Sequence, residues 1–94
     1  MLKNLQKRNK IESERGFKPS VDILSRITKV LLENNSTGKT NLSLQTNVNY
    51  VRVLKHLKWL EKRNLIESVV EDDKIVIILT ESGRKFALTL TDIS

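Results

Sequence analysis

The stretch 47–67, NVNYVRVLKHLKWLEKRNLIE, constrains the fold of this chain more than any other. At 100° per residue, one face of a helix over this stretch collects Val53, His56, Leu57 and Leu60. The opposite face collects Val51, Lys55, Lys58 and Lys62, flanked by Arg52 and Trp59. One face is therefore predicted to pack on a core, with His56 as a buried packing residue, and the other to present cations.

Ninety-four residues are enough for one small domain with a single hydrophobic core. The chain contains no cysteine, and one histidine cannot build a structural zinc site, so neither disulfides nor such a metal centre are expected. No apolar run approaches the roughly 18 residues of a membrane span, and the N-terminus lacks the apolar region of a secretory signal. We therefore expect a soluble protein of the cytoplasm.

Charge is unevenly distributed along the chain. Residues 1–65 hold 14 Lys or Arg against 5 acids, giving +9, whereas residues 66–94 hold 3 against 6, giving −3. A basic surface on a helix-rich domain favours nucleic acid as the partner over an acidic membrane surface or an acidic protein.

Start and stop signals divide the chain into a basic arm, residues 1–18, and a domain, residues 19–94. Ser20 is placed to cap a helix that ends at Asn34 and Asn35. A turn and a short helix, TNLSLQT, follow, with Leu42 directed inward. Asn49 then caps the basic helix, and Asn64 suits the left-handed residue that ends it.

The sequence after the basic helix is rich in residues that favour β-strands. LIESVVEDDKIVIILT predicts a β-hairpin that turns at Asp72 and Asp73. Thr80 is placed to cap a last short helix that carries Phe86 and Leu90 on one side. The order helix, helix, helix, hairpin, helix predicts an α+β fold.

The predicted core takes its side chains from every element: Ile23, Ile27, Val30, Leu31, Leu42, Val53, Leu57, Leu60, Ile66, Ile75, Ile77, Phe86 and Leu90. This leaves a surplus of apolar residues: Leu32, Leu54, Trp59, Leu88 and Ile93. A surplus of this kind on a small domain indicates an interface, so we expect a homodimer. Trp59 fits either the edge of the core or a contact with a partner or the hairpin.

Two short motifs carry a family resemblance. Leu60, Asn64, Leu65 and Ile66 follow the pattern L-x-x-x-G-L-I, with Asn64 in place of glycine. Leu79, Thr80, Gly83 and Phe86 follow L-T-x-x-G-x-x-F. In this order and spacing they resemble the winged helix-turn-helix domain, in particular small archaeal DNA-binding proteins and MarR-like regulators.

The resemblance implies a recognition helix at 49–63, a hairpin wing at 66–79, and pairing by C2 symmetry onto half-sites about 34 Å apart. A major groove about 12 Å wide admits one α-helix, whose first residues meet the base edges. Asn49, Tyr50, Arg52 and Lys55 are then the expected base-reading residues. Lys58, Lys62, Lys39 and Thr40 are expected at phosphates.

Other chemistries fit the sequence less well. STGKT at 36–40 ends like a phosphate-binding loop, but Glu33 stands where the first glycine of that pattern belongs. Neither a Ser, His and Asp set nor paired inward carboxylates indicate catalysis, so we expect no enzyme, cofactor, metal or small-molecule ligand. The predicted function is that of a transcriptional regulator that binds a specific sequence of double-stranded DNA and is associated with the nucleoid. A weakly specific chromatin-type protein and a winged-helix protein-interaction module remain as alternatives.

Overall fold

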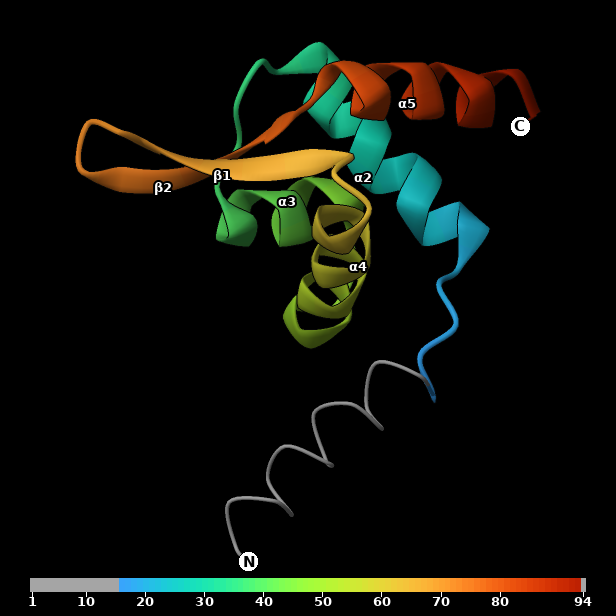
Figure 1. Ribbon diagram of the computed structural model, residues 1–94. Helices are drawn as coiled ribbons and strands as arrows, with labels where there is room; N and C mark the ends of the chain where they lie inside the picture. The colour runs from blue at the N-terminus through green and yellow to red at the C-terminus, as the bar shows by residue number, and fades with distance from the viewer. Residues whose placement is uncertain (1–15, 94) are drawn as a thin grey trace, which may run out of the picture.

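The computed structural model describes residues 16–93, and the basic arm predicted over residues 1–18 lies mostly outside this range. The elements follow the predicted order (Figure 1): α2 (Val21–Glu33), α3 (Lys39–Thr46), α4 (Tyr50–Lys62), β1 (Ile66–Glu71), β2 (Lys74–Leu79) and α5 (Glu81–Ile93). Helix α2 crosses the centre of the molecule, with α5 on one side and α3 and α4 on the other, while the hairpin projects from them. The predicted α+β architecture is confirmed.

Helix α2 starts at a side-chain cap, whereas α3 starts without one. Ser20 Oγ accepts the Ile23 N–H at 3.2 Å, which satisfies one of the free amides at the start of α2. Helix α3 begins at Lys39, after Gly38 in an extended conformation, and ends at Asn47 in the left-handed region with φ of 58°. Asn64, after α4, has the same φ of 58°, as predicted from its sequence position.

The hairpin pairs β1 and β2 antiparallel, from Ile66 opposite Leu79 to Glu71 opposite Lys74. Asp72 and Asp73 form its turn with φ of 52° and 63°, and two successive positive φ angles characterise a type I′ turn. Thr37 extends the sheet through an isolated antiparallel bridge to Ile77, with backbone bonds of 2.8 and 3.1 Å. The hairpin base is thereby held against the loop before α3.

One hydrophobic core joins all six elements. Its most deeply buried apolar side chains include Ile27, Leu31, Leu42, Val53, Leu60, Ile77 and Ala87. Leu24, Leu79 and Ala87 belong to it and were missing from the prediction, while Phe86 is only partly buried. Most of the predicted core is confirmed.

The prediction for Ile75 was wrong, since 60% of this residue is exposed. Ile75 shares a sheet face with Ile77 and Leu79, so the period-two pattern assigned its side correctly. The strand, however, runs past the end of the core, and Ile75 faces its cross-strand partner Val70 in solvent. The predicted surplus is also smaller than expected, because Leu32 and Trp59 pack against the core.

The two signature motifs meet each other in space. Thr80 Oγ1 donates to the Asn64 carbonyl at 2.6 Å and accepts the Gly83 N–H at 3.0 Å. The Thr80 N–H donates to the Leu65 carbonyl at 3.1 Å. A Cβ at Gly83 would lie 1.8 Å from that same Leu65 oxygen, so only glycine allows α5 to approach the start of β1 this closely.

Candidate nucleic-acid interface

Helix α4 has the two faces that the sequence predicts. Val53, His56, Leu57 and Leu60 are buried, and they anchor the helix against the core. Val51, Lys55, Lys58 and Lys62 are exposed on the opposite side, and we call these four residues the outer line of α4. Six of the eight predicted site residues therefore lie on α4 or its cap, and none of these six is buried.

Asn49 caps α4, as predicted. Its Oδ1 accepts the Val51 N–H at 2.8 Å, and Val53 N donates to the Asn49 carbonyl at 2.9 Å. Asn49 is also one of the expected base-reading residues, and asparagine reads adenine through its side-chain amide. Because Oδ1 already accepts the Val51 N–H, a bidentate contact with adenine, which needs both Oδ1 and Nδ2, would compete with the cap, whereas Nδ2 remains available to a nucleic acid.

The first turns of α4 present Tyr50, Arg52 and Lys55 to solvent. Tyr50 is 44% exposed at the first helical position, and within residues 16–93 its hydroxyl has no hydrogen-bond partner. Arg52 lies on the flank of α4 that faces the start of α2, where both elements line a shared cleft. These side chains are available to a partner without breaking an internal contact.

Lys39 and Thr40 occupy the start of α3, where Lys39 is half-buried and Thr40 is exposed. They lie at the end of the eight-residue helix that is farther from the turn into α4, and Lys39 is about 10 Å from Thr46 along the helix axis. Helices α3 and α4 pack together around Leu42 and Val53, and Ser43 Oγ donates to the Val48 carbonyl across the turn at 2.6 Å. These contacts hold α3 and α4 in one arrangement, and they set the distance between Lys39 at the start of α3 and the lysines of α4.

His56 joins α4 to the segment before α2. Only 2% of it is exposed, and its Nε2 accepts the Ser20 N–H at 3.0 Å, so Nδ1 carries the hydrogen and donates to the Arg52 carbonyl at 2.7 Å. Phe17 packs edge-on against the ring, with centroids 4.9 Å apart. Burial lowers the pKa of His56, the Arg52 charge lowers it further, and the bond to the Arg52 carbonyl opposes both effects. The predicted packing role is confirmed.

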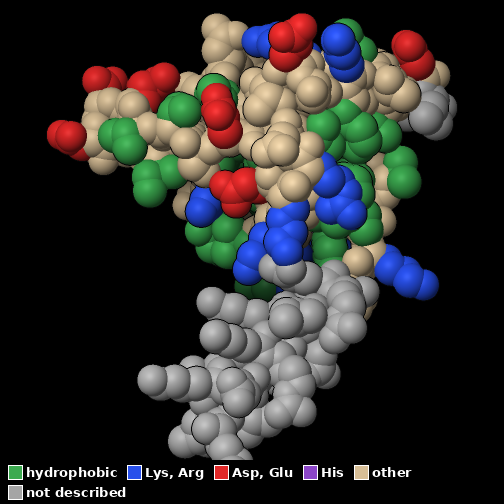
Figure 2. All heavy atoms as spheres, in the orientation of Figure 1, with side chains coloured by type: hydrophobic (Ala, Val, Ile, Leu, Met, Phe, Trp, Pro, Cys, Tyr) green, Lys and Arg blue, Asp and Glu red, His purple; other side chains and the backbone are tan. Residues whose placement is uncertain are grey.

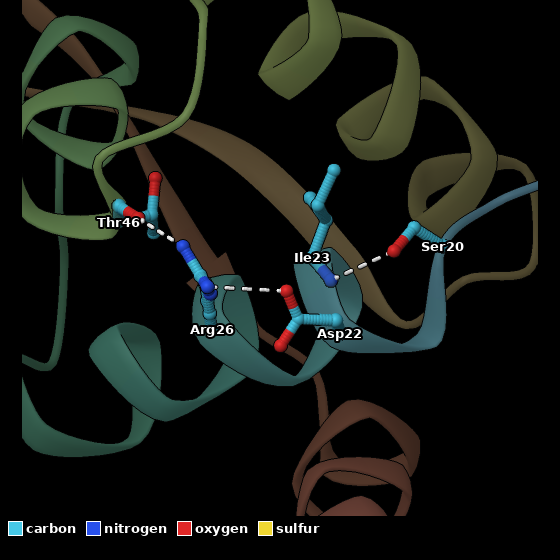
Figure 3. Close-up of polar contacts among 5 residues, drawn as sticks. All are labelled: Ser20, Asp22, Ile23, Arg26 and Thr46. Atoms are coloured by element: carbon cyan, nitrogen blue, oxygen red, sulfur yellow. Dashed lines mark hydrogen bonds and ion pairs between the residues drawn. The ribbon is translucent and has the colours of Figure 1, made fainter.

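Arg26 was not among the predicted site residues, although it braces the turn between α3 and α4 (Figure 3). Its guanidinium donates to the Thr46 carbonyl at 3.2 Å and pairs with Asp22 at 3.2 Å. The Asp22 and Arg26 side chains line an open cleft of about 270 Å³ between the start of α2 and the start of α4. The i, i+4 spacing of these two residues indicates only a surface ion pair, so no sequence pattern predicts the contact with Thr46.

Trp59 lies at the edge of the core rather than free in solvent. Its ring is 6.2 Å from that of Phe86 on α5, and the Arg63 guanidinium stacks over it at 3.9 Å. Arg63 also donates to the Trp59 carbonyl at 3.1 Å. Of the readings left open by the sequence, the core-edge position is the one observed in this chain.

Acidic side chains mark the end of the hairpin. On the face shown in Figure 2, they lie at that end and also among the other elements, while a group of Lys and Arg side chains lies below the hairpin, around α4. The hairpin tip consists of Glu71, Asp72 and Asp73 with Lys74, and Ser36 Oγ donates to Glu71 at 3.0 Å. The tip is therefore a poor surface for phosphates.

Other site types are not evident in residues 16–93. No group of three His, Cys, Asp or Glu side chains is arranged to hold a metal ion there. No helix in this part of the chain is long and apolar enough to cross a membrane.

Comparison with solved structures finds the same fold in regulators and DNA-binding proteins. A MarR family transcriptional regulator from Silicibacter pomeroyi aligns with a TM-score of 0.67 and 20% identity, over 94% of this chain and 61% of that one. Sso10a-2, a DNA-binding protein from Sulfolobus solfataricus, aligns with a TM-score of 0.69 and 22% identity, over 81% and 78%. A single-residue mutant of ZitR from Lactococcus lactis aligns with a TM-score of 0.69 and 22% identity, over 82% and 53%.

This chain thus spans about three fifths of the Silicibacter regulator and about half of ZitR. No curated protein matches its sequence. The family model for the winged helix-turn-helix matches residues 19–94, which include all six described elements. The chain therefore belongs to the winged helix-turn-helix family.

Proposed function

We propose that this protein is a transcriptional regulator that binds a specific sequence of double-stranded DNA and reads the major groove with α4. The outer line of α4 is the observation that carries the proposal. Three lysines stand exposed on a helix whose opposite face is locked into the core, so the cations are held on a rigid support. A helix of 13 residues with this charge fits the major groove.

Roles follow from position along the helix-turn-helix. Arg52 and Lys55, in the first two turns of α4, contact base edges, with Tyr50 beside them. Lys58 and Lys62 lie farther along and contact phosphates. Lys39 and Thr40, about 10 Å from the turn, contact a different stretch of backbone, which fixes the register of α4 in the groove.

A wing that enters the minor groove carries basic residues at its tip, whereas the tip of this hairpin is acidic. In one arrangement the acidic tip stays clear of the DNA, and the basic arm, residues 1–18, supplies flanking contacts through Lys3, Lys7, Arg8 and Lys10. In the other, the tip repels unrelated sequences and so sharpens selectivity. Deleting residues 1–10 separates the two arrangements. A large loss of affinity indicates arm contacts, whereas little change leaves the tip as a device for selectivity.

We further propose that the protein acts as a homodimer in the cytoplasm, at the nucleoid. Leu88 on α5 is 56% exposed, and the resemblance to MarR-like regulators supports pairing through terminal helices. Light scattering at tens of micromolar should give the mass of a dimer. The mass of a monomer under these conditions would contradict the dimer.

Selection of bound oligonucleotides from a random pool tests the function itself. Enrichment of one palindromic sequence is expected, because a C2 dimer reads two related half-sites. Salt-sensitive binding without enrichment would replace the proposal with a weakly specific chromatin-type protein. If micromolar protein bound no duplex at low salt, the chain would instead be a protein-interaction module.

A further inference from the structure

Val51 is an exposed apolar residue at the start of the cationic side of α4. It is the first member of the outer line of α4 and is 57% exposed, whereas Lys55 and Lys58 follow it along the same side. Its side chain points away from the buried line that begins with Val53. Packing within the domain therefore does not explain an apolar side chain at this position.

Local helix stability does not explain it either. A β-branched residue loses side-chain freedom in a helix, so valine is a weaker choice than lysine or alanine at an exposed helical position. Asn49 already caps α4 through its own side chain, and Val51 contributes only a backbone N–H to that cap. Any residue except proline could supply this amide.

The position of Val51 indicates which group of the DNA its apolar side chain contacts. It is the second residue of α4, in the first turn, where a recognition helix meets base edges. The apolar group that a major groove presents is the C5-methyl of thymine. The cap already engages Asn49 Oδ1, so Val51 is the side chain at this place that is free to contact an A·T pair, and its chemistry matches the thymine side.

We infer that Val51 is a specificity-determining residue that packs against a thymine methyl group in the bound DNA. The inference rests on the proposed function and adds to it the class of base pair read by the start of α4. It also gives Val51 and its neighbours on α4 different roles in recognising the bases. Arg52 and Lys55 make polar contacts, and Val51 makes the apolar one.

Deoxyuridine tests this contact, because it differs from thymidine only by the missing methyl group. In the oligonucleotide selected from the random pool, thymines are replaced by deoxyuridine one position at a time, and the affinity of the full chain is measured. One position per half-site should weaken wild-type binding about three- to fourfold, the effect of one buried methyl group. Val51→Ala should bind the thymine and deoxyuridine duplexes equally, and Val51→Ile should restore the difference.

Val70→Ala is the matched control, because Val70 is also exposed, at 74%, but lies on the acidic hairpin. It should keep the wild-type response to deoxyuridine. Duplex binding that no deoxyuridine substitution weakens would overturn this inference and leave the proposed function intact. A response that persists in Val51→Ala would assign the methyl contact to another residue and overturn it too. Absence of any duplex binding would overturn both.

Discussion

Replacing Gly83 by alanine should destabilise the domain, although a glycine-to-alanine change inside a helix usually stabilises that helix. The new Cβ would lie 1.8 Å from the Leu65 carbonyl oxygen and 2.8 Å from its carbon. Contacts under 3.0 Å are essentially not formed by real Cβ atoms, so α5 must retreat from β1 by at least 1.2 Å, the difference between 3.0 and 1.8 Å. Both atoms belong to backbone, so no flexible side chain can absorb the clash.

The retreat has a cost that can be assigned to particular contacts. Overpacking typically costs about 1–3 kcal/mol. The Thr80 N–H to Leu65 bond, worth about 1 kcal/mol, stretches with it. Alanine in a helix returns about 1 kcal/mol relative to glycine. The net loss in the free energy of unfolding is therefore about 2 kcal/mol, or about 10 °C in Tm for a domain of this size.

Urea and thermal unfolding, followed by circular dichroism, measure this loss. Gly38→Ala is the matched control, because a Cβ at Gly38 meets nothing within 4 Å, and its φ is −76°. It should change stability by less than about 1 kcal/mol. A Gly83→Ala protein as stable as the wild type would show that the close approach of α5 to Leu65 is not a constraint on this fold.

Three further outcomes are expected. The pKa of His56 is lowered in the folded chain, so the unfolded chain binds a proton more readily, and the free energy of unfolding should be full above pH 6.5 and decline as the pH falls below it. In urea unfolding at several pH values, His56→Gln should flatten this decline, and an unchanged pH profile would exclude His56 as its cause. Arg52→Ala should cost about 1–3 kcal/mol on the selected site and relax one base position, whereas Lys62→Ala should weaken all duplexes about equally and lower the salt slope by about one; equal effects in competition binding would refute these roles. Asp72→Asn with Asp73→Gly keeps the positive φ angles of the turn and should tighten binding to random duplex about two- to fivefold at low salt, and no change in a titration would place the hairpin away from DNA.

The sequence determines the elements of this fold because their signals are local. Ser20, Asn49 and Thr80 each cap the helix that follows, and the run of strand-forming residues after Asn64 forms the hairpin with its turn at Asp72 and Asp73. The helical period also predicts correctly which side of α4 is buried. Each of these patterns depends on residues only a few positions apart, so it can be recognised in a single amino-acid sequence without the structure.

Other features depend on where elements end in space. Alternation places Ile75 on the core face of its strand but does not reveal that β2 extends beyond the core. The contact of Arg26 with the Thr46 carbonyl joins residues twenty positions apart. The hydrogen bond from Ser20 to His56 likewise appears only when the segment before α2 meets α4.

The salt dependence of duplex binding tests most directly whether the outer line of α4 is the DNA-binding surface. Lys58→Gln with Lys62→Gln removes from that line the two exposed lysines assigned to phosphates, and Lys29→Gln with Lys85→Gln removes two exposed cations from α2 and α5 as a control of equal charge. Plotted as log affinity against log salt, the slope should fall by about two for the first variant and stay near the wild-type value for the second, because only phosphate contacts release counterions. Equal slopes for the two variants would contradict the assignment of α4 to the DNA.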